Sequence, residues 1–396
     1  MSHLTEFPLA RPAGCPFDPP AALTELRAEE PVARMTYPGG HEGWVVTGFA
    51  EARTVLADQR FSSRQELLRM PYRMPGMDEL PEMPPAAVGD MTGIDAPEHT
   101  RFRKLLVGSF TVRRMRQLTE RVAQVTAEHL AAMRELGPEV DLVEAFAHPV
   151  PAVMICELLG VPYEDRDTFQ RYVTLLFSAD APAEERYEGI VKLQEYVGQL
   201  VVAKRAEPTD DLFSDLTATD LTDEELAGVG SLLLAAGLDT TANQIALGSY
   251  VLLRQPEQIP LLLNDPDAAV EELLRYLTIT HTNVRTALED VEIGGQVIRA
   301  GETVTLSLQA ANRDPLRFDN PDELDLTRSA IGHLTFGHGI HQCLGQQLAR
   351  VEMRVSMPAL FTAFPTLRLA GEPTLRPGHQ SIYGVQSLPV SWEETR

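Results

Sequence analysis

Helical periodicity dominates residues 100–253, where apolar residues recur every three or four positions. The longest stretch begins with Thr222-Asp223-Glu224-Glu225, which has the form of a capping box, and continues through Leu253 to Pro256. Such a helix is long enough to cross a domain. Helix breaks are predicted near Gly137-Pro138, Gly160-Val161-Pro162, Ala181-Pro182 and Pro208-Thr209-Asp210.

Alternating apolar and polar residues predict short strands at both ends of the chain. Residues 43–47 favour a small sheet at the edge of the fold, and after Arg285 residues 291–293 and 304–306 alternate between turn signals. A last helix is predicted from about Leu344 to Phe361, followed by an irregular tail. The pattern predicts a mainly α protein with a minor β part, in one domain covering residues 1–396.

Methionine and proline crowd residues 70–91, with five of each. Regular helices and strands tolerate few prolines, so a long loop is predicted there.

Composition and charge narrow the class of protein. With 44% hydrophobic residues the chain can bury a large core, and the formal net charge of -23 argues against binding to nucleic acid or to an anionic membrane. No apolar stretch predicts a signal peptide or a membrane span, so we expect a cytoplasmic protein. Three distant cysteines and no CxxC disfavour disulfides and zinc cages.

One of these cysteines lies in an unusual segment. Residues 336–345 place three glycines around Cys343 and lead directly into the last helix. Glycines permit positive φ and close approach to a flat ligand, while a helix N-terminus stabilises a thiolate. A single thiolate suffices as the axial ligand of haem iron. A buried cysteine after a glycine turn is the alternative.

A second polar constellation interrupts the long helix at residues 236–241. Gly237 weakens the helix, and the Thr240 hydroxyl can turn onto the carbonyl of Ala236, which would open a groove for oxygen and water. Asp239 beside it suits a proton relay, which oxygen activation requires. The alternative is a helix with a back-bonded threonine pair and a solvated aspartate.

These segments together resemble the soluble bacterial cytochrome P450 family, and actinomycete members in particular. Phe336, Gly337, Gly339, Cys343 and Gly345 match the family's haem-ligand signature, residues 236–240 resemble its oxygen-activation motif, and Glu272-Leu273-Leu274-Arg275 matches its ExxR helix. The resemblance covers nearly the whole chain. It implies a P450-like fold with haem b, iron protoporphyrin IX, between the long central helix and the Cys343 loop.

The resemblance also implies roles for individual residues. Cys343 would be the iron ligand, Asp239 and Thr240 the catalytic pair, and the ExxR pair a structural support for the haem. The family often completes that support with an arginine or histidine where this chain has Glu323, so Arg328 is our candidate instead. The other expected cofactor-binding residues are His99, Arg103, Ala236, Gly237, Arg285, Phe336, Gly337, His341 and Gly345, of which His99, Arg103, Arg285 and His341 would hold the two propionates.

The resemblance also implies which segments contact the substrate and which surface receives the electron donor. The loop 70–91 would roof the substrate, residues 178–182 would form a second lid, and substrate contacts would come from Met83, Val88, Thr282, Asn283 and Val284. Residues 101–116 contain six basic residues and no acid, which suits docking of an acidic ferredoxin or flavodoxin with its reductase.

We therefore expect a monomeric haem-thiolate monooxygenase that uses electrons and O2 to hydroxylate or epoxidise an apolar small molecule, such as a polyketide, macrolide or terpenoid. One alternative is a peroxygenase that uses hydrogen peroxide and does not need the Asp239–Thr240 relay. A haem-binding sensor or carrier is the other, and it has no use for a proton relay.

Overall fold

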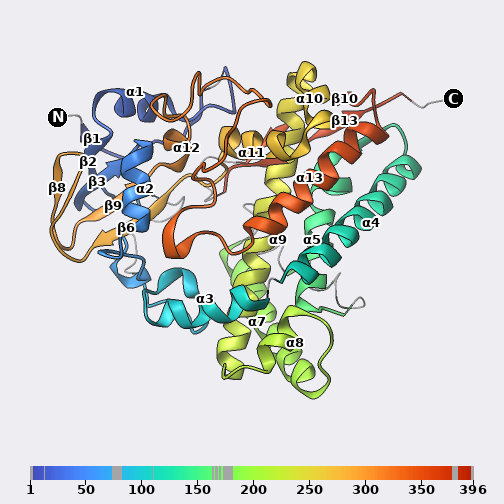
Figure 1. Cartoon of the computed structure of the whole chain (residues 1–396), viewed down its shortest axis with the longest axis horizontal. Coiled ribbons are helices and arrows are strands. Elements are labelled where there is room, and N and C mark those ends of the chain that lie inside the picture. The colour runs from blue at the N-terminus through green and yellow to red at the C-terminus, as the bar shows by residue number, and fades with distance from the viewer. Residues whose placement is uncertain are drawn as a thin grey trace.

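The computed structural model describes residues 3–12, 14–73, 83–109, 111–162, 165, 168, 171–172, 182–376 and 382–393. The predicted second lid at 178–182 and the middle of the methionine-rich loop therefore lie largely outside the described residues. Helices fill most of the molecule, and the strands of the main sheet gather at one side of it (Figure 1). This confirms the mainly α fold with a minor β part.

The long central helix is α9, and it was predicted almost to the residue. It spans Asp223–Arg254, and its capping box is formed: the Thr222 hydroxyl accepts from the Glu225 amide, and Glu225 accepts from the Thr222 amide. Helices α5, α7 and α13 pack on it (Figure 1). The remaining α-helices of the described residues are α1 (Ala21–Glu29), α2 (Phe49–Ala57), α3 (Glu98–Ser109), α4 (Val112–Leu136), α5 (Pro149–Leu159), α7 (Ala183–Ala206), α8 (Leu212–Thr217), α10 (Ile259–Asn264), α11 (Pro266–Leu277), α12 (Leu308–Ala311) and α13 (Gln346–Ala363).

The main sheet joins strands from the two ends of the chain. Its order is β1-β2-β3-β9-β6-β4, in which β3 runs parallel to β9, more than 250 residues later in the sequence. The predicted strands are present as β3, β7 and β9. Bounds in this sheet are β1 His3–Leu4, β2 Val32–Thr36, β3 Glu42–Val46, β4 Phe61–Ser62, β6 Asn283–Ala287 and β9 Thr303–Leu306, and the hairpin beside it pairs β7 Val291–Ile293 with β8 Gln296–Ile298.

The C-terminal tail is more regular than its sequence indicates. It forms β10 (Arg368–Leu369), β11 (Thr374–Leu375), β12 (Val385–Ser387) and β13 (Pro389–Ser391), with β13 also pairing β5 (Glu139–Asp141). Our expectation of an irregular tail was wrong here, because strands of two or three residues are too short to show an alternating pattern.

The described ends of the loop 70–91 contain no helix or strand until a 3-10 turn at Met91–Gly93, as predicted. Two glycines attach this loop to α9. A Cβ on Gly228 would lie 1.8 Å from the carbonyl oxygen of Val88, and one on Gly89 would lie 2.5 Å from that of Glu225. Gly89 also has φ +85°, which favours glycine. Loop and helix therefore touch backbone to backbone.

None of the helices in the described ranges combines the length and the apolarity that a bilayer-spanning segment needs.

Candidate haem and oxygen site

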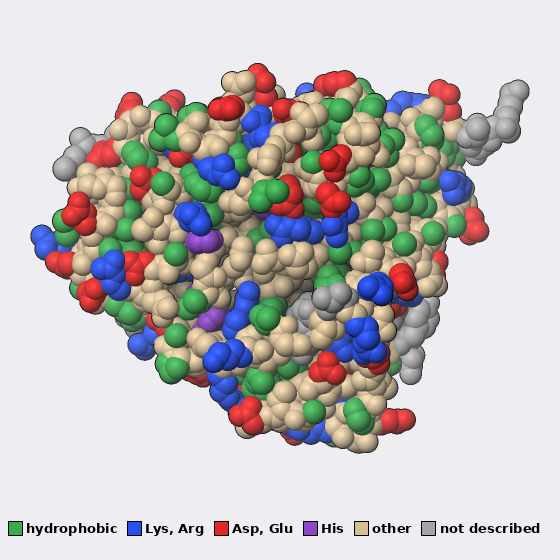
Figure 2. All heavy atoms as spheres, viewed as in Figure 1, with side chains coloured by type: hydrophobic (Ala, Val, Ile, Leu, Met, Phe, Trp, Pro, Cys, Tyr) green, Lys and Arg blue, Asp and Glu red, His purple; other side chains and the backbone are tan. Residues whose placement is uncertain are grey.

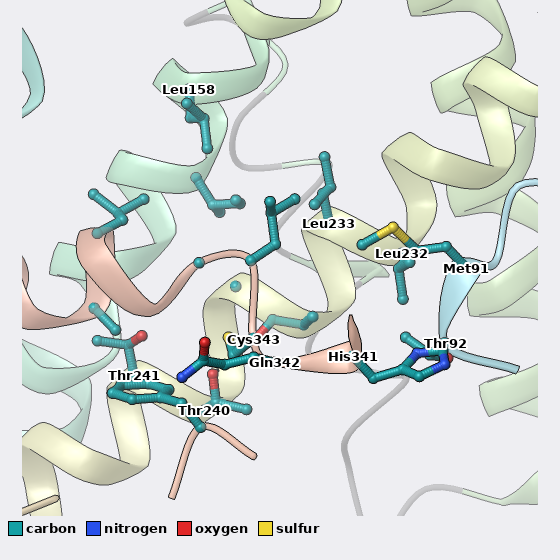
Figure 3. Close-up of a pocket in the computed structure, with 18 of the residues that line it drawn as sticks. Met91, Thr92, Leu158, Leu232, Leu233, Thr240, Thr241, His341, Gln342 and Cys343 are labelled. Atoms are coloured by element: carbon teal, nitrogen blue, oxygen red, sulfur yellow. The ribbon is translucent and has the colours of Figure 1, made fainter. Parts of the chain in front are cut away.

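A cavity separates the Cys343 loop and α13 from the middle of α9, and it encloses about 920 Å³ of empty space, part of it open to solvent. Most of the predicted cofactor residues lie on its wall, joined by others that the sequence did not indicate (Figure 3). The predicted cofactor residues on the wall are His99, Arg103, Ala236, Gly237, Phe336, His341, Cys343 and Gly345, and the catalytic candidate Thr240 lies there too.

Cys343 faces this cavity from the N-terminal end of α13. Its own amide donates to the carbonyl of Phe336 across 2.8 Å, which closes the loop, and the amides of Gly345 and Gln346 donate toward its sulfur. Burial raises the pKa of the thiol, and these amides together with Arg103 oppose the rise. The sulfur is accessible, yet to an enclosed space, and this geometry suits a metal or cofactor ligand.

Close packing fixes the loop that carries Cys343. Gly337 and Gly339 have φ of +69° and +75°, and a Cβ on Gly339 would lie 2.3 Å from the carbonyl oxygen of Leu56 in α2. Gly337 itself is not among the described wall residues and acts through this turn. Gly337 and Gly339 thus allow the positive φ angles of the turn, and Gly339 also allows the loop to pack against α2.

Two imidazoles stand together at one end of the cavity. The rings of His99 and His341 are 4.1 Å apart between centroids, and neither His99 Nδ1 nor His341 Nε2 has a hydrogen-bond partner among the described residues. Burial lowers the pKa of both, that of His341 to about 3, with cationic neighbours adding to the effect. Figure 3 shows His341 beside Thr92, away from the end where Thr240 and Cys343 lie.

Two arginines add positive charge near these histidines. Arg103 is on the same helical face as His99 and lines the same cavity, whereas Arg285 lines a neighbouring cavity that shares His341. Burial lowers the pKa of Arg285 to about 10, and its guanidinium donates to Asn283 Oδ1 and the Val284 carbonyl. No described carboxylate forms an ion pair with either arginine, so both guanidinium groups can pair with an anionic ligand.

Thr240 lies on the α9 wall, and its hydroxyl donates to the Ala236 carbonyl at 2.8 Å, as predicted. The helix nevertheless continues without interruption, and Gly237 serves packing: a Cβ there would lie 2.7 Å from Ile155 Cδ1. The expected opening of the helix at Gly237 is therefore not seen, and Gly237 instead allows α5 to pack closely against α9.

Asp239 points elsewhere. It is 2% exposed, is absent from the described cavity wall, and accepts two hydrogen bonds of 2.6 and 2.8 Å from Arg376. Asn243 Nδ2 donates to Asp239 Oδ1 at 3.1 Å. The reading of this residue as a solvated aspartate is therefore wrong, since the carboxylate is buried and paired. The sequence did not reveal Arg376, which lies in the tail.

The ExxR pair forms a closed network behind the cavity. Both residues are buried, and Arg275 donates to Glu272 at 2.7 and 2.8 Å and to the carbonyls of Asn312 and Pro321 at 2.9 Å. Arg328 Nε donates to Glu272 at 3.1 Å, so the prediction that Arg328 completes the network is confirmed. Glu323 takes part through its backbone carbonyl alone.

The five predicted substrate contacts are not among the described wall residues of this cavity. Val88 is 48% exposed, while Met83, Thr282, Asn283 and Val284 are half-buried. Their role stays a prediction. Met91, the last residue of the loop expected to roof the substrate, does line the cavity. Wall residues without a predicted role are Thr92, Ile155, Leu158, Leu232, Leu233, Thr241, Gln342, Leu344, Leu348, Ala349 and Glu352. Among these residues only Glu352 could have been noticed in the sequence, because it is an acid between the apolar residues Val351 and Met353.

The basic stretch 101–116 is largely neutralised within the fold. Arg101 pairs with Glu225 at 2.5 Å, Arg113 with Asp210 at 3.0 Å and Arg114 with Asp215 at 2.6 Å. Arg103 faces the cavity. Lys104 and Arg116 are exposed, and no ion pair to another described residue is found for them. Fewer unpaired positive charges therefore remain on this stretch for a redox partner than its sequence indicates.

Comparison with known proteins agrees with the site. The profile of the cytochrome P450 family matches residues 257–389. Cytochrome P450 105C1 of a Streptomyces species is 48% identical over 385 residues, covering 95% of this chain and 96% of that protein. Pentalenic acid synthase of Streptomyces avermitilis is 43% identical, with 96% and 95% covered. The crystal structure of CYP105P1 in complex with filipin I superposes with a TM-score of 0.90 at 41% identity, over 99% and 100% of the chains.

The chain therefore belongs to the cytochrome P450 family. It is a haem-dependent monooxygenase that inserts one oxygen atom from O2 into a small-molecule substrate, with electrons supplied by redox partners.

Proposed function

We propose that haem binds in the cavity between α9 and the Cys343 loop, with Cys343 as its iron ligand. One observation carries this proposal: the sulfur faces an enclosed space whose far corner holds two unpartnered imidazole nitrogens and an unpaired arginine. Buried polar atoms without partners are uncommon in proteins, and imidazole and guanidinium groups gathered in one corner fit a ligand that brings two carboxylates. His99, Arg103, Arg285 and His341 would hold these propionates, while Ala236, Gly237, Phe336, Gly337 and Gly345 would shape the space around the ring.

Haem with a thiolate ligand supplies the oxygen-activating chemistry when it is bound. Thr240 is proposed as the catalytic hydroxyl, because its side chain is held on the cavity wall by the Ala236 carbonyl. Asp239 is proposed as its acidic partner, acting from behind the helix, since Arg376 keeps its carboxylate turned away from the cavity. Proton transfer through Asp239 would require this ion pair to open.

The substrate is proposed to be an apolar secondary metabolite. Leu158, Leu232, Leu233 and Met91 give the cavity an apolar wall, and the relatives include a pentalenic acid synthase and a protein crystallised with filipin I. Met83, Val88, Thr282, Asn283 and Val284 remain proposed contacts for a substrate larger than this cavity. We further propose a monomeric protein with a single domain, residues 1–396, that works in the cytoplasm.

The electron donor is proposed to be a ferredoxin or flavodoxin with its reductase. On the face that Figure 2 shows, lysine and arginine side chains surround a central hollow, although the whole chain is strongly acidic. An acidic partner would be steered to this face.

The test is the spectrum of the reduced, CO-treated holoenzyme. We expect the long-wavelength Soret band of thiolate-ligated haem, and its loss in Cys343→Ser together with the loss of oxygenation. Absence of the band in the unmodified protein would disprove ligation by Cys343.

A further inference from the structure

Four polar side chains from distant parts of the chain meet outside the described wall of the haem cavity. They are Arg11 of the N-terminal segment, His281 between α11 and β6, Gln309 of α12 and Tyr383 of the tail. The Arg11 guanidinium donates to Gln309 Oε1 at 3.0 Å and lies 3.8 Å over the centre of the Tyr383 ring. The rings of His281 and Tyr383 are 6.0 Å apart between centroids. We call these four residues the Arg11 cluster.

Several buried polar atoms of the cluster have no partner. Arg11 Nε, Gln309 Nε2 and both ring nitrogens of His281 lack a hydrogen bond to any described residue. His281 is 0% exposed and Gln309 is 3% exposed, so bulk water does not reach them. Most buried polar atoms in proteins have a partner, and unpaired ones gathered in one cluster therefore indicate that a further group belongs there.

The unpaired atoms are mostly donors. Arg11 Nε carries a hydrogen, and Gln309 Nε2 is the amide nitrogen because Oε1 accepts from Arg11. Burial lowers the pKa of His281 to about 3, with the Arg11 charge adding to the effect, so its imidazole is neutral and donates from one nitrogen. A small anion can accept from all three side chains. A water would also have to place its own hydrogens, and the second nitrogen of His281 is the one acceptor among the unpaired atoms.

The cluster also has a positive charge without an ion pair. The remaining hydrogen bonds of Arg11 go to the carbonyls of Pro16 and Phe17, at 3.5 and 3.1 Å, and burial lowers its pKa to about 10. Asp18 attracts this charge from beyond ion-pair distance, and its carboxylate pairs with Arg313 instead. A buried charge is costly unless an opposite charge accompanies it, and a single guanidinium calls for a monovalent anion.

We infer that the Arg11 cluster is a binding site for a small monovalent anion, with chloride as its occupant. Arg11, His281 and Gln309 supply the N–H donors, and the Tyr383 ring supports the guanidinium from below. The inference goes beyond the proposed function and does not depend on it, because none of these residues takes part in haem binding or oxygen activation.

A bound anion would fasten the N-terminal segment and α12 to the connection that leads into β6. His281 lies in this connection, and the tail is already joined to it by the hydrogen bond from the Tyr383 amide to the Ile279 carbonyl, 2.8 Å long. A ligand that binds the folded chain and not the unfolded one stabilises the fold as its concentration rises above Kd. Chloride should therefore raise the unfolding temperature.

Thermal unfolding of the holoenzyme tests this at constant ionic strength, with sodium gluconate replaced stepwise by sodium chloride. We expect Tm to rise along a saturating curve, by roughly 2–5 °C in total. The shift should vanish in Gln309→Glu, whose carboxylate would pair with Arg11 in place of the anion, and in His281→Phe, which removes a donor. The matched control Arg27→Gln removes a bond to the Ala310 carbonyl of the same helix, α12, and should keep the shift.

The inference is overturned if the unmodified protein shows no shift, or if the shift persists in either cluster variant that folds. A crystal grown in sodium bromide gives the second readout and needs no variant. We expect an anomalous bromide peak at hydrogen-bonding distance from Arg11 Nε and Gln309 Nε2. Water at this place without an anomalous signal would overturn the inference, and so would a peak without a shift in Tm, which would mean binding at crystal concentration only. Failure of the proposed function is recognised separately, by a missing thiolate band.

Discussion

The two sides of the Cys343 loop satisfy their buried polar groups in opposite ways. Behind the loop, Glu272, Arg275 and Arg328 bond to one another and to backbone carbonyls, so the network is complete before any ligand binds. On the cavity side, His99 Nδ1, His341 Nε2 and Glu352 Oε2 have no described partner. Complete networks of this kind support a fold, whereas groups left unsatisfied in a cavity indicate where ligand, water or proton belongs. Each side should respond differently to substitution.

The largest effect is expected behind the loop. Replacing Arg275 by methionine leaves the Glu272 carboxylate buried and only partly compensated, which should lower the free energy of unfolding by roughly 3–5 kcal/mol. Denaturant unfolding of the purified protein measures this loss. The matched control is Arg328→Gln, which removes a bond to Glu272 and bonds to three backbone carbonyls from a partly exposed side chain, and it should cost about 1–2 kcal/mol. Equal losses in the two variants would contradict a network centred on Arg275.

Glu352 should make stability depend on pH. Its pKa is raised in the folded state, so the stability that it contributes is present below about pH 4.5 and is lost as pH rises through about 8. Between pH 6 and pH 8 the unmodified protein should lose about 2 kcal/mol more than Glu352→Gln does. Unfolding curves of both proteins at the two pH values give the comparison, and parallel curves would exclude a raised pKa.

On the cavity side, His341 should matter more for haem than for folding. His341→Phe removes a donor that has no described partner, so unfolding of the haem-free protein should change by less than about 1 kcal/mol. Haem should dissociate faster, because a propionate loses a donor. Transfer of haem to an acceptor globin measures the rate. If His341→Phe instead destabilised the haem-free protein and left the rate of haem loss unchanged, His341 would support the fold and not the haem.

The smallest effect is expected at the surface. Lys104→Glu and Arg116→Glu change side chains without described ion pairs, and they should slow reduction by the electron donor a few-fold at low salt, less at high salt. Arg113→Gln, whose native partner is Asp210, serves as the control. Stopped-flow reduction at several ionic strengths distinguishes the variants, and a salt-independent loss would argue against steering.

Local patterns were enough to predict α9, the Cys343 loop and the pairing of Thr240 with the Ala236 carbonyl. Caps, glycines and periodicity act over a few residues, so the sequence displays them directly. The partners of Asp239 and Glu352 depend on elements far away in the chain. Arg376 reaches Asp239 from the C-terminal tail, and the isolation of Glu352 results from what surrounds α13, so neither followed from a local pattern. Arg328 could be predicted because Glu323 stands where the family often has a basic residue, and Arg328 lies five residues further along the chain.

Gly89 and Gly228 let the backbone of the methionine-rich loop lie directly against the backbone of α9, because neither residue has a side chain. The attachment therefore places no demand on the identity of the residues between Met83 and Val88. A variant library that keeps both glycines and randomises these positions should yield mostly folded proteins, each with a different loop surface beside α9. Under the proposed contact of this loop with substrate, such variants should differ in substrate range while the two glycines keep the loop on α9.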